Sequence, residues 1–190
     1  DTEHLYLTAG LLAFYQQLRI FEEQKDALAP YGLERPLWVF VGSSVTQTLK
    51  KVGTDIERIL DFLARFVRER QESIHLLQRL LSGNTGLTSG GRDVFAGKFG
   101  YLIERGIAGS MLYDDILRRL FNAETNARLR AEELKGADGE LALRLGNAEP
   151  FGVINIGDAA GLRKLLEGNS GLEATSREIS HSVFARLSDP

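Results

Sequence analysis

Two places in the chain combine glycine with small polar residues in a pattern that could do chemistry. Gly42-Ser43-Ser44 comes directly after a short apolar run, residues 37–41, and Gly157-Asp158 comes directly after a second one, residues 151–156. Backbone amides and hydroxyls at such exits can hold a phosphodiester backbone without strong positive charge. Gly42, Ser43, Ser44, Gly157 and Asp158 are therefore candidate nucleic-acid-binding residues. The alternative interpretation is that both places are ordinary strand-to-helix turns.

Both apolar runs have the composition of buried strands. Residues 37–41 (Leu-Trp-Val-Phe-Val) are apolar and rich in β-branched and aromatic side chains, and Pro36 precedes them. Such a run is typical of a strand inside a parallel sheet that helices cover on both faces. If the two strands are adjacent and parallel, their exits share the carboxyl edge of the sheet, where ligands bind in open α/β folds.

Other catalytic patterns are incomplete. The chain contains neither a Walker A loop nor a G-x-G-x-x-G turn after a strand, so it offers no self-sufficient nucleotide site. The stretch 41–45 has a strand and a serine but lacks the second glycine of a hydrolase elbow. With 0 cysteines and 3 widely spaced histidines, thiol chemistry and a zinc site have no basis.

Two weaker patterns keep an alternative open. Asp114-Asp115 followed by Glu133-Leu134-Lys135 has the layout of a magnesium-dependent nuclease site, with carboxylates for the metal and a lysine for developing charge. A stripe of arginines is either a solvated helix face or a surface that faces phosphates. Its members are Arg58, Arg65, Arg68, Arg70 and Arg79.

Hydrophobic spacing predicts the elements that must position these residues. A capping box at Thr54 and Glu57 starts a helix that ends at Gly83, after a loop at 46–53. Asp158 caps a helix over 159–167. Further helices are predicted at 4–28, 93–104, 110–121 and 178–187, and a β-hairpin at 128–145. The fold class is α/β, a parallel sheet flanked by helices with a mostly helical insertion.

Composition indicates an ordinary globular domain. The 190 residues include 43% hydrophobic ones, and the net charge of −3 announces no strongly basic surface. No apolar run approaches the roughly 20 residues of a membrane span, so we expect no membrane partner and a cytoplasmic location. The chain starts at Asp1 rather than Met, and we expect it to be a piece of a longer protein.

Four segments resemble one family. Residues 11–15, 36–45, 134–140 and 151–162 are similar to the second RecA-like domain of DEAD/DEAH-box helicases related to the type III restriction endonuclease Res subunit. The resemblance implies that 1–53 are the first part of that lobe, that 54–145 are a helical insertion with a hairpin, and that 146–190 continue the lobe. It also implies that 39–44 are helicase motif IV and that the turn after 153–158 faces the nucleic acid.

The resemblance further implies what this segment does not carry. The Walker A lysine and the D-E-x-H magnesium motif belong to the first RecA-like lobe of such a protein, so ATP and Mg²⁺ are cofactors of the parent and none is expected here. The expected partners are nucleic acid, with DNA the first choice, and the first lobe of the same chain. We therefore expect part of a helicase or translocase that does not hydrolyse ATP alone. A protein-interaction module that uses the helical insertion is the alternative from a different class.

Overall fold

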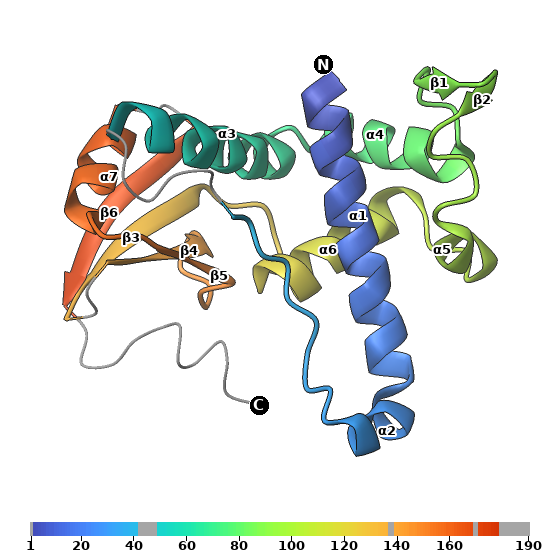
Figure 1. The fold of residues 1–190 in the computed structure, drawn as a ribbon, viewed down its shortest axis with the longest axis horizontal. Helices are drawn as coiled ribbons and strands as arrows, with labels where there is room; N and C mark the ends of the chain where they lie inside the picture. The colour runs from blue at the N-terminus through green and yellow to red at the C-terminus, as the bar shows by residue number, and fades with distance from the viewer. Residues whose placement is uncertain (1, 42–48, 137–138, 169–170, 179–190) are drawn as a thin grey trace. The chain divides into compact units, whose positions relative to one another are not determined.

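The computed structural model describes residues 2–41, 49–136, 139–168 and 171–178 (Figure 1). The chain forms two compact units, one of residues 1–39 with 69–116 and one of residues 40–68 with 117–190. This grouping follows spatial contacts. The resemblance instead divides the chain after residues 53 and 145, according to the place of each segment in a helicase lobe. That division stays a prediction.

The second unit is built on a four-stranded sheet with the strand order β5-β4-β3-β6. β4 is antiparallel to both of its neighbours, and β6 is parallel to β3, so β3, β5 and β6 all run in one direction. The α/β class is confirmed and is compatible with part of a RecA-like lobe. The sheet is mixed rather than parallel because β4 returns from β3 as the second strand of the predicted hairpin. The strands are β3 (Leu129–Lys135), β4 (Glu140–Leu145), β5 (Gly152–Asn155) and β6 (Leu172–Glu178).

Two helices pack on this sheet. α7 (Ala159–Leu166) contacts β3, β4 and β6, and α3 (Leu49–Arg68) contacts β3, β6 and α7. Because side chains alternate along a strand, every second residue of the three longer strands faces the same side. The register aligns Leu129 with both Leu145 and Leu172, and all three leucines are at most 2% exposed. These leucines form the apolar centre of the unit.

The alternate residues of the sheet are charged and paired. Arg130 Nε lies 2.9 Å from Glu173 Oε2, and Arg144 Nη2 lies 3.0 Å from Glu132 Oε2, so each ion pair joins two neighbouring strands. Opposite charges placed across strands stabilise the register that aligns them. The pattern of leucines on one face and paired charges on the other thus fixes the order and the alignment of β3, β4 and β6.

The first unit is mainly helical. The buried face of α1 contributes leucines together with Tyr15 and Phe21 to its core, and α1 contacts α4. The helix predicted at 4–28 is confirmed as α1 and α2, and the one predicted at 110–121 as α6. The elements of this unit are α1 (Thr2–Glu23), α2 (Lys25–Leu28), η1 (Ala29–Tyr31), α4 (Arg70–Ser82), β1 (Thr88–Ser89), β2 (Arg92–Asp93), α5 (Gly100–Glu104) and the start of α6 (Gly109–Phe121).

A buried polar triad ties α1 to α6 in this unit. The Tyr15 hydroxyl donates to Asp115 Oδ2 at 2.5 Å, and Arg19 Nη1 donates to the same oxygen at 2.8 Å. Tyr15 is 0% exposed and Asp115 is 9% exposed. A carboxylate buried without partners is costly, so the two donors are what permits Asp115 to be there. Burial and the hydrogen bond to Asp115 raise the pKa of Tyr15.

Several predicted boundaries are wrong. α3 begins at Leu49, inside the predicted 46–53 loop, so Thr54 does not start a helix. The single helix predicted up to Gly83 breaks at Glu69, whose φ of −98° and ψ of 58° are not helical. Of the helix predicted at 93–104 only α5 forms. β6 was not predicted, and the helix predicted at 178–187 lies outside the described residues except for Glu178.

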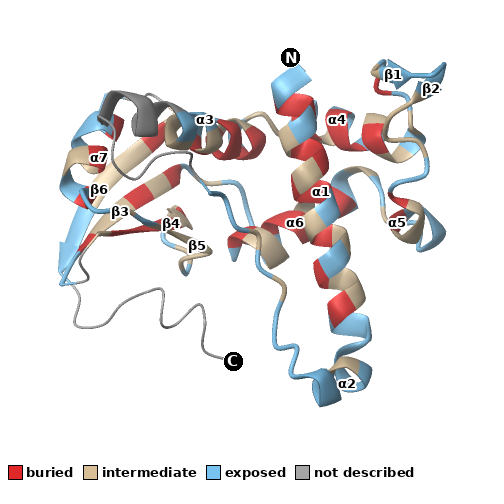
Figure 2. Cartoon of the chain, in the orientation of Figure 1, coloured by how far each residue is buried: buried red, intermediate tan, exposed pale blue. Residues whose placement is uncertain are grey.

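The buried strand predicted at 37–41 is also wrong for this structure. These residues belong to no strand or helix, and Leu37, Val39 and Val41 are 66%, 69% and 89% exposed (Figure 2). An apolar run is buried in a sheet only when strands flank it, and no strand within the described residues pairs with this one. Trp38 packs at 5.9 Å from Phe14 between ring centres.

The Tyr15 triad predicts how stability depends on pH. Tyr15→Phe removes a hydrogen bond to a buried carboxylate and should lower the free energy of unfolding by about 1.5–3 kcal/mol at pH 7. Because the folded pKa of Tyr15 lies above the unfolded value of about 10, its contribution is complete below pH 10 and is lost as the pH rises further. The gap between wild type and variant should therefore shrink above pH 10. Urea unfolding at pH 7 and pH 11 measures it.

The matched control for this experiment is Tyr31→Phe. Tyr31 is 77% exposed, so removing its hydroxyl should leave the stability unchanged at both pH values. A Tyr15→Phe variant as stable as the wild type at pH 7, or a gap that is the same at both pH values, would contradict the role assigned to the triad.

Candidate nucleic-acid interface

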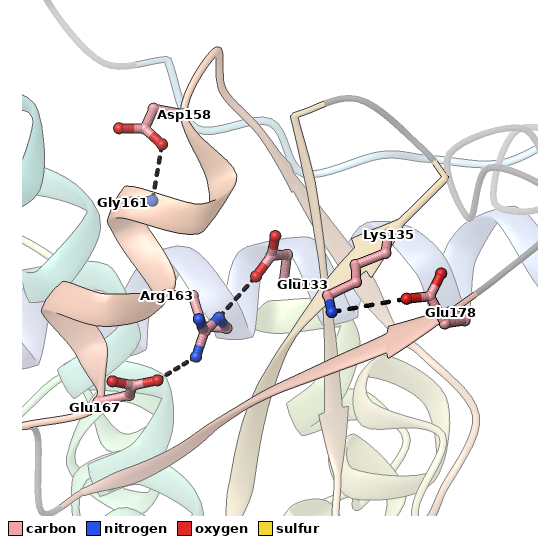
Figure 3. A network of polar contacts seen from close by, with 7 residues as sticks. All are labelled: Glu133, Lys135, Asp158, Gly161, Arg163, Glu167 and Glu178. Carbon is pink, nitrogen blue, oxygen red and sulfur yellow. Dashed lines mark hydrogen bonds and ion pairs between the residues drawn. The ribbon is translucent and has the colours of Figure 1, made fainter.

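The candidate interface is the edge of the sheet where β3, β5 and β6 end. The last residues of these strands are Lys135, Asn155 and Glu178, and the chain leaves β5 through Gly157 and Asp158. Because strands that run in one direction end at the same edge, these residues lie along it. The close view shows Lys135 paired with Glu178 there and Asp158 at the start of α7 (Figure 3). Gly157 and Asp158 follow the end of β5, as the sequence predicted, and their role in nucleic-acid binding stays a prediction.

Gly157 leaves the backbone of this edge open. It is exposed, and no heavy atom outside its immediate neighbours lies within 4 Å of the position that a Cβ would take. Its φ is not positive, so the backbone conformation itself does not require glycine. Glycine at this position thus has no packing role within the described residues, whereas it permits another backbone to approach closely.

Asp158 is the N-cap of α7. Its Oδ1 accepts a hydrogen bond from the Gly161 amide at 2.8 Å. A Cβ on Gly161 would lie 2.2 Å from Asp158 Oδ2, so the cap and the glycine three residues later depend on each other. The carboxylate occupies the place at the helix start that an anion would otherwise take. Asp158 therefore shapes the turn, and its negative charge would repel a phosphate.

A positive charge at this edge comes from Lys135. Its Nζ lies 3.6 Å from Glu178 Oε1, and the two side chains are 53% and 82% exposed. An ion pair this exposed is weak, so a phosphate could displace the glutamate. The sequence drew attention to Lys135 in a nuclease pattern and within the segment 134–140 of the resemblance, and in neither case as a residue that binds nucleic acid. Its place at the end of a strand was the signal that would have assigned it to the edge.

Arg163 is committed to holding α7 on the sheet. Its Nε donates to Glu133 Oε2 at 2.7 Å, and its Nη1 pairs with Glu167 on the next turn of the helix. The hydrogen bond to Glu133 raises the pKa of Arg163. The guanidinium and the Glu133 carboxylate thus satisfy each other, and neither is available to a ligand without breaking this contact.

Gly139 sets the shape of the edge by backbone contact. The Ile156 amide donates to the Gly139 carbonyl at 2.8 Å, which joins the start of β4 to the exit of β5. Gly139 has a φ of 78°, and a Cβ there would lie 2.2 Å from the Ile156 carbonyl oxygen. Only glycine combines this conformation with this close approach.

The remaining predicted site residues, Gly42, Ser43 and Ser44, lie outside the described residues. The predicted common edge of 42–44 with Gly157 and Asp158 is therefore untested, and the strand expected to lead into 42–44 is not formed.

The residues of the nuclease alternative are engaged elsewhere. Asp114 accepts two hydrogen bonds from Arg70, at 2.9 and 3.2 Å, Asp115 belongs to the Tyr15 triad, and Glu133 pairs with Arg163. Among the described residues, no three His, Cys, Asp or Glu side chains are grouped so that they could hold a metal ion. The structure gives the magnesium-dependent nuclease no support.

Two arginines of the predicted stripe, Arg70 and Arg79, have structural partners. Arg70 is paired with Asp114 and stacks over Tyr113 with 5.1 Å to the ring centre. Arg79 donates to the carbonyl oxygens of Asn84 and Thr85. These two arginines thus have structural partners within the first unit, whereas Arg58, Arg65 and Arg68 belong to the second unit.

Comparison of the chain with protein-family models, with curated proteins and with solved structures gave no match. No helix in the described part of the chain is long and apolar enough to span a bilayer.

The Gly139 contact predicts a large effect from a small substitution. Gly139→Ala forces a Cβ into the Ile156 carbonyl at a positive φ and should destabilise the second unit by more than about 2 kcal/mol. Gly157→Ala, at the residue directly after Ile156, adds a Cβ in open space and should change the stability by less than about 0.5 kcal/mol. Thermal unfolding followed by circular dichroism compares the two. Equal melting temperatures for both variants would show that the contact does not shape the edge.

Proposed function

We propose that this chain is part of the second motor lobe of an ATP-dependent nucleic-acid helicase or translocase and that it contacts the nucleic-acid backbone at the carboxyl edge of β3, β5 and β6. The observation that carries the proposal is that three strands of one direction end at one edge, which carries an open glycine backbone after β5, Gly157, and an exposed cation at the end of β3, Lys135. Close backbone approach and a displaceable cation are what a phosphodiester contact needs. The resemblance to the helicase family supports the same edge.

The charges of the edge favour a weak contact without sequence preference. Lys135 is offset by Glu178, and Asp158 adds a negative charge. A site of this kind positions a backbone and reads no bases. In the parent protein, the grip on the strand would come from closure against the first RecA-like lobe. That lobe would also carry ATP and Mg²⁺.

Binding of a labelled single-stranded DNA by fluorescence anisotropy at low salt tests the proposed edge. We expect a dissociation constant in the range of about 1–100 µM that weakens with salt. Gly157→Ala should reduce affinity several-fold without loss of stability, since the added methyl blocks only an incoming backbone. Lys135→Ala should reduce affinity and lower the slope of log affinity against log salt by roughly 0.7, the value for one phosphate contact on a single strand.

Lys164→Ala is the matched control, because Lys164 is an exposed cation on α7 of the same unit. It should leave the salt slope unchanged. Two results would refute the proposed interface. One is wild-type binding that neither Gly157→Ala nor Lys135→Ala weakens. The other is no binding at low salt, which would favour the interaction module as the function of the chain.

A second expectation concerns ATP. The chain has no Walker A loop, so the purified chain with Mg²⁺ and single-stranded DNA should release no phosphate from ATP above the rate of the buffer. A coupled phosphate-release assay measures this. Turnover that co-purifies with the chain and persists in the Lys135→Ala variant would mean that the chain contains a nucleotide site of its own.

A further inference from the structure

Two cations of the second unit, Arg163 and Lys135, have carboxylate partners of different kinds (Figure 3). Arg163 is held by Glu133 and Glu167, and the side chains of Arg163 and Glu133 are only 22% and 16% exposed. Lys135 is paired with Glu178, whose side chain is 82% exposed. The first contact holds α7 on β3, whereas the second joins two strands that their backbone ladder already holds together. A ligand that separates Lys135 from Glu178 would therefore break no packing contact.

The strand register keeps Glu178 beside Lys135. The two residues are direct partners in the parallel pair of β3 and β6, and each is the last residue of its strand. Lys135 Nζ lies 3.6 Å from Glu178 Oε1, which is longer than a charge-assisted hydrogen bond of about 2.7–2.9 Å. The backbone thus tethers the carboxylate next to the ammonium group, while a change of side-chain rotamer is enough to separate the two charges.

We propose that Glu178 is a tethered competitor for Lys135. Its carboxylate is paired with the ammonium group in the unbound protein and must swing away before a phosphate of a nucleic-acid strand binds there. The carboxylate and the phosphate are both anions, so each repels the other from the same cation. Because the tether gives the carboxylate a high effective concentration, it returns as soon as the phosphate leaves. This inference rests on the proposed nucleic-acid contact and assigns the residue that limits its affinity.

The neighbouring carboxylates are engaged by other groups. Asp158 Oδ1 accepts a hydrogen bond from the Gly161 amide at 2.8 Å, and Glu133 Oε2 accepts one from Arg163 Nε at 2.7 Å. Both contacts belong to the start and the packing of α7, so these carboxylates keep their partners when a ligand binds. Of the carboxylates drawn in Figure 3, Glu178 is the one paired with the cation that the proposed contact uses. Neutralising Glu178 should therefore affect binding more than neutralising a carboxylate elsewhere in the unit.

Glu178→Gln tests the competition, because glutamine keeps the shape of the side chain and removes its charge. Fluorescence anisotropy with labelled oligothymidine at low salt should give an affinity about two- to fivefold higher than that of the wild type, the range for loss of an exposed ion pair. The gain should shrink as the salt concentration rises, since ions screen the pair. The variant should fold as the wild type does, because the Glu178 side chain is 82% exposed, and circular dichroism checks this.

Glu149→Gln is the matched control, since it removes one negative charge from the opposite edge of the same sheet. Glu149 is exposed and lies between β4 and β5, at the edge where β5 begins. It should leave the affinity at the wild-type value. An equal gain from Glu149→Gln and Glu178→Gln would show that net charge alone sets the affinity, and it would overturn the inference.

A Lys135→Ala background separates competition for the lysine from simple repulsion of the phosphate. Without the ammonium group the carboxylate has no cation to compete for, so Glu178→Gln should raise the affinity of the Lys135→Ala variant less than that of the wild type. An equal gain in both backgrounds would overturn the inference. Wild-type binding that Glu178→Gln does not strengthen would overturn the inference and leave the proposed interface standing. No binding by either protein at low salt would overturn both.

Discussion

The arrangement of the second unit depends on one backbone contact, the hydrogen bond from the Ile156 amide to the Gly139 carbonyl. β4 must run back beside β3 and then meet β5, so the chain passes the same edge of the sheet twice within a short sequence. The contact brings the start of β4 against the exit of β5, and it requires glycine because a side chain would strike the Ile156 carbonyl. The position of Gly157 and the start of α7 follow from it.

The same edge shows how one carboxylate serves structure at the expense of binding. Asp158 satisfies the amide of Gly161 and so begins α7 at a defined residue. A free helix start would attract phosphate, but here the attraction is already used. Affinity for a nucleic-acid backbone would have to come from the open glycine and from Lys135. The edge is consequently suited to a weak, transient contact, as the proposed role in a motor lobe would require.

Local signals in the sequence identified the elements whose stability is local. The hairpin of β3 and β4, the helix α6, and α7 with its Asp158 cap follow from spacing, turn residues and capping, and all of them form as predicted. The failures have tertiary causes. β6 reads as polar because only Leu172 of its residues is fully buried, and its place in the sheet comes from pairing with β3. Thr54 and Glu57 are the residue types of a capping box, but α3 starts earlier, at Leu49. Thr54 therefore has no helix start to cap.

The prediction for the segment 36–41 failed for the opposite reason. Its composition predicts a buried strand, but no strand within the described residues pairs with it. β-branched and aromatic side chains predict burial, yet burial requires neighbours. Trp38 packs against Phe14 of α1, whereas Leu37, Val39 and Val41 stay exposed. The exposed apolar side chains of this segment would bind a partner through apolar burial, whereas the polar edge at Gly157 would bind one through charge and hydrogen bonds. Salt should weaken a phosphate contact at the edge and leave apolar contacts of Leu37, Val39 and Val41 unaffected or strengthened, since ions screen charges but do not weaken apolar burial. Salt dependence alone thus separates the two surfaces, whichever of them a given partner uses.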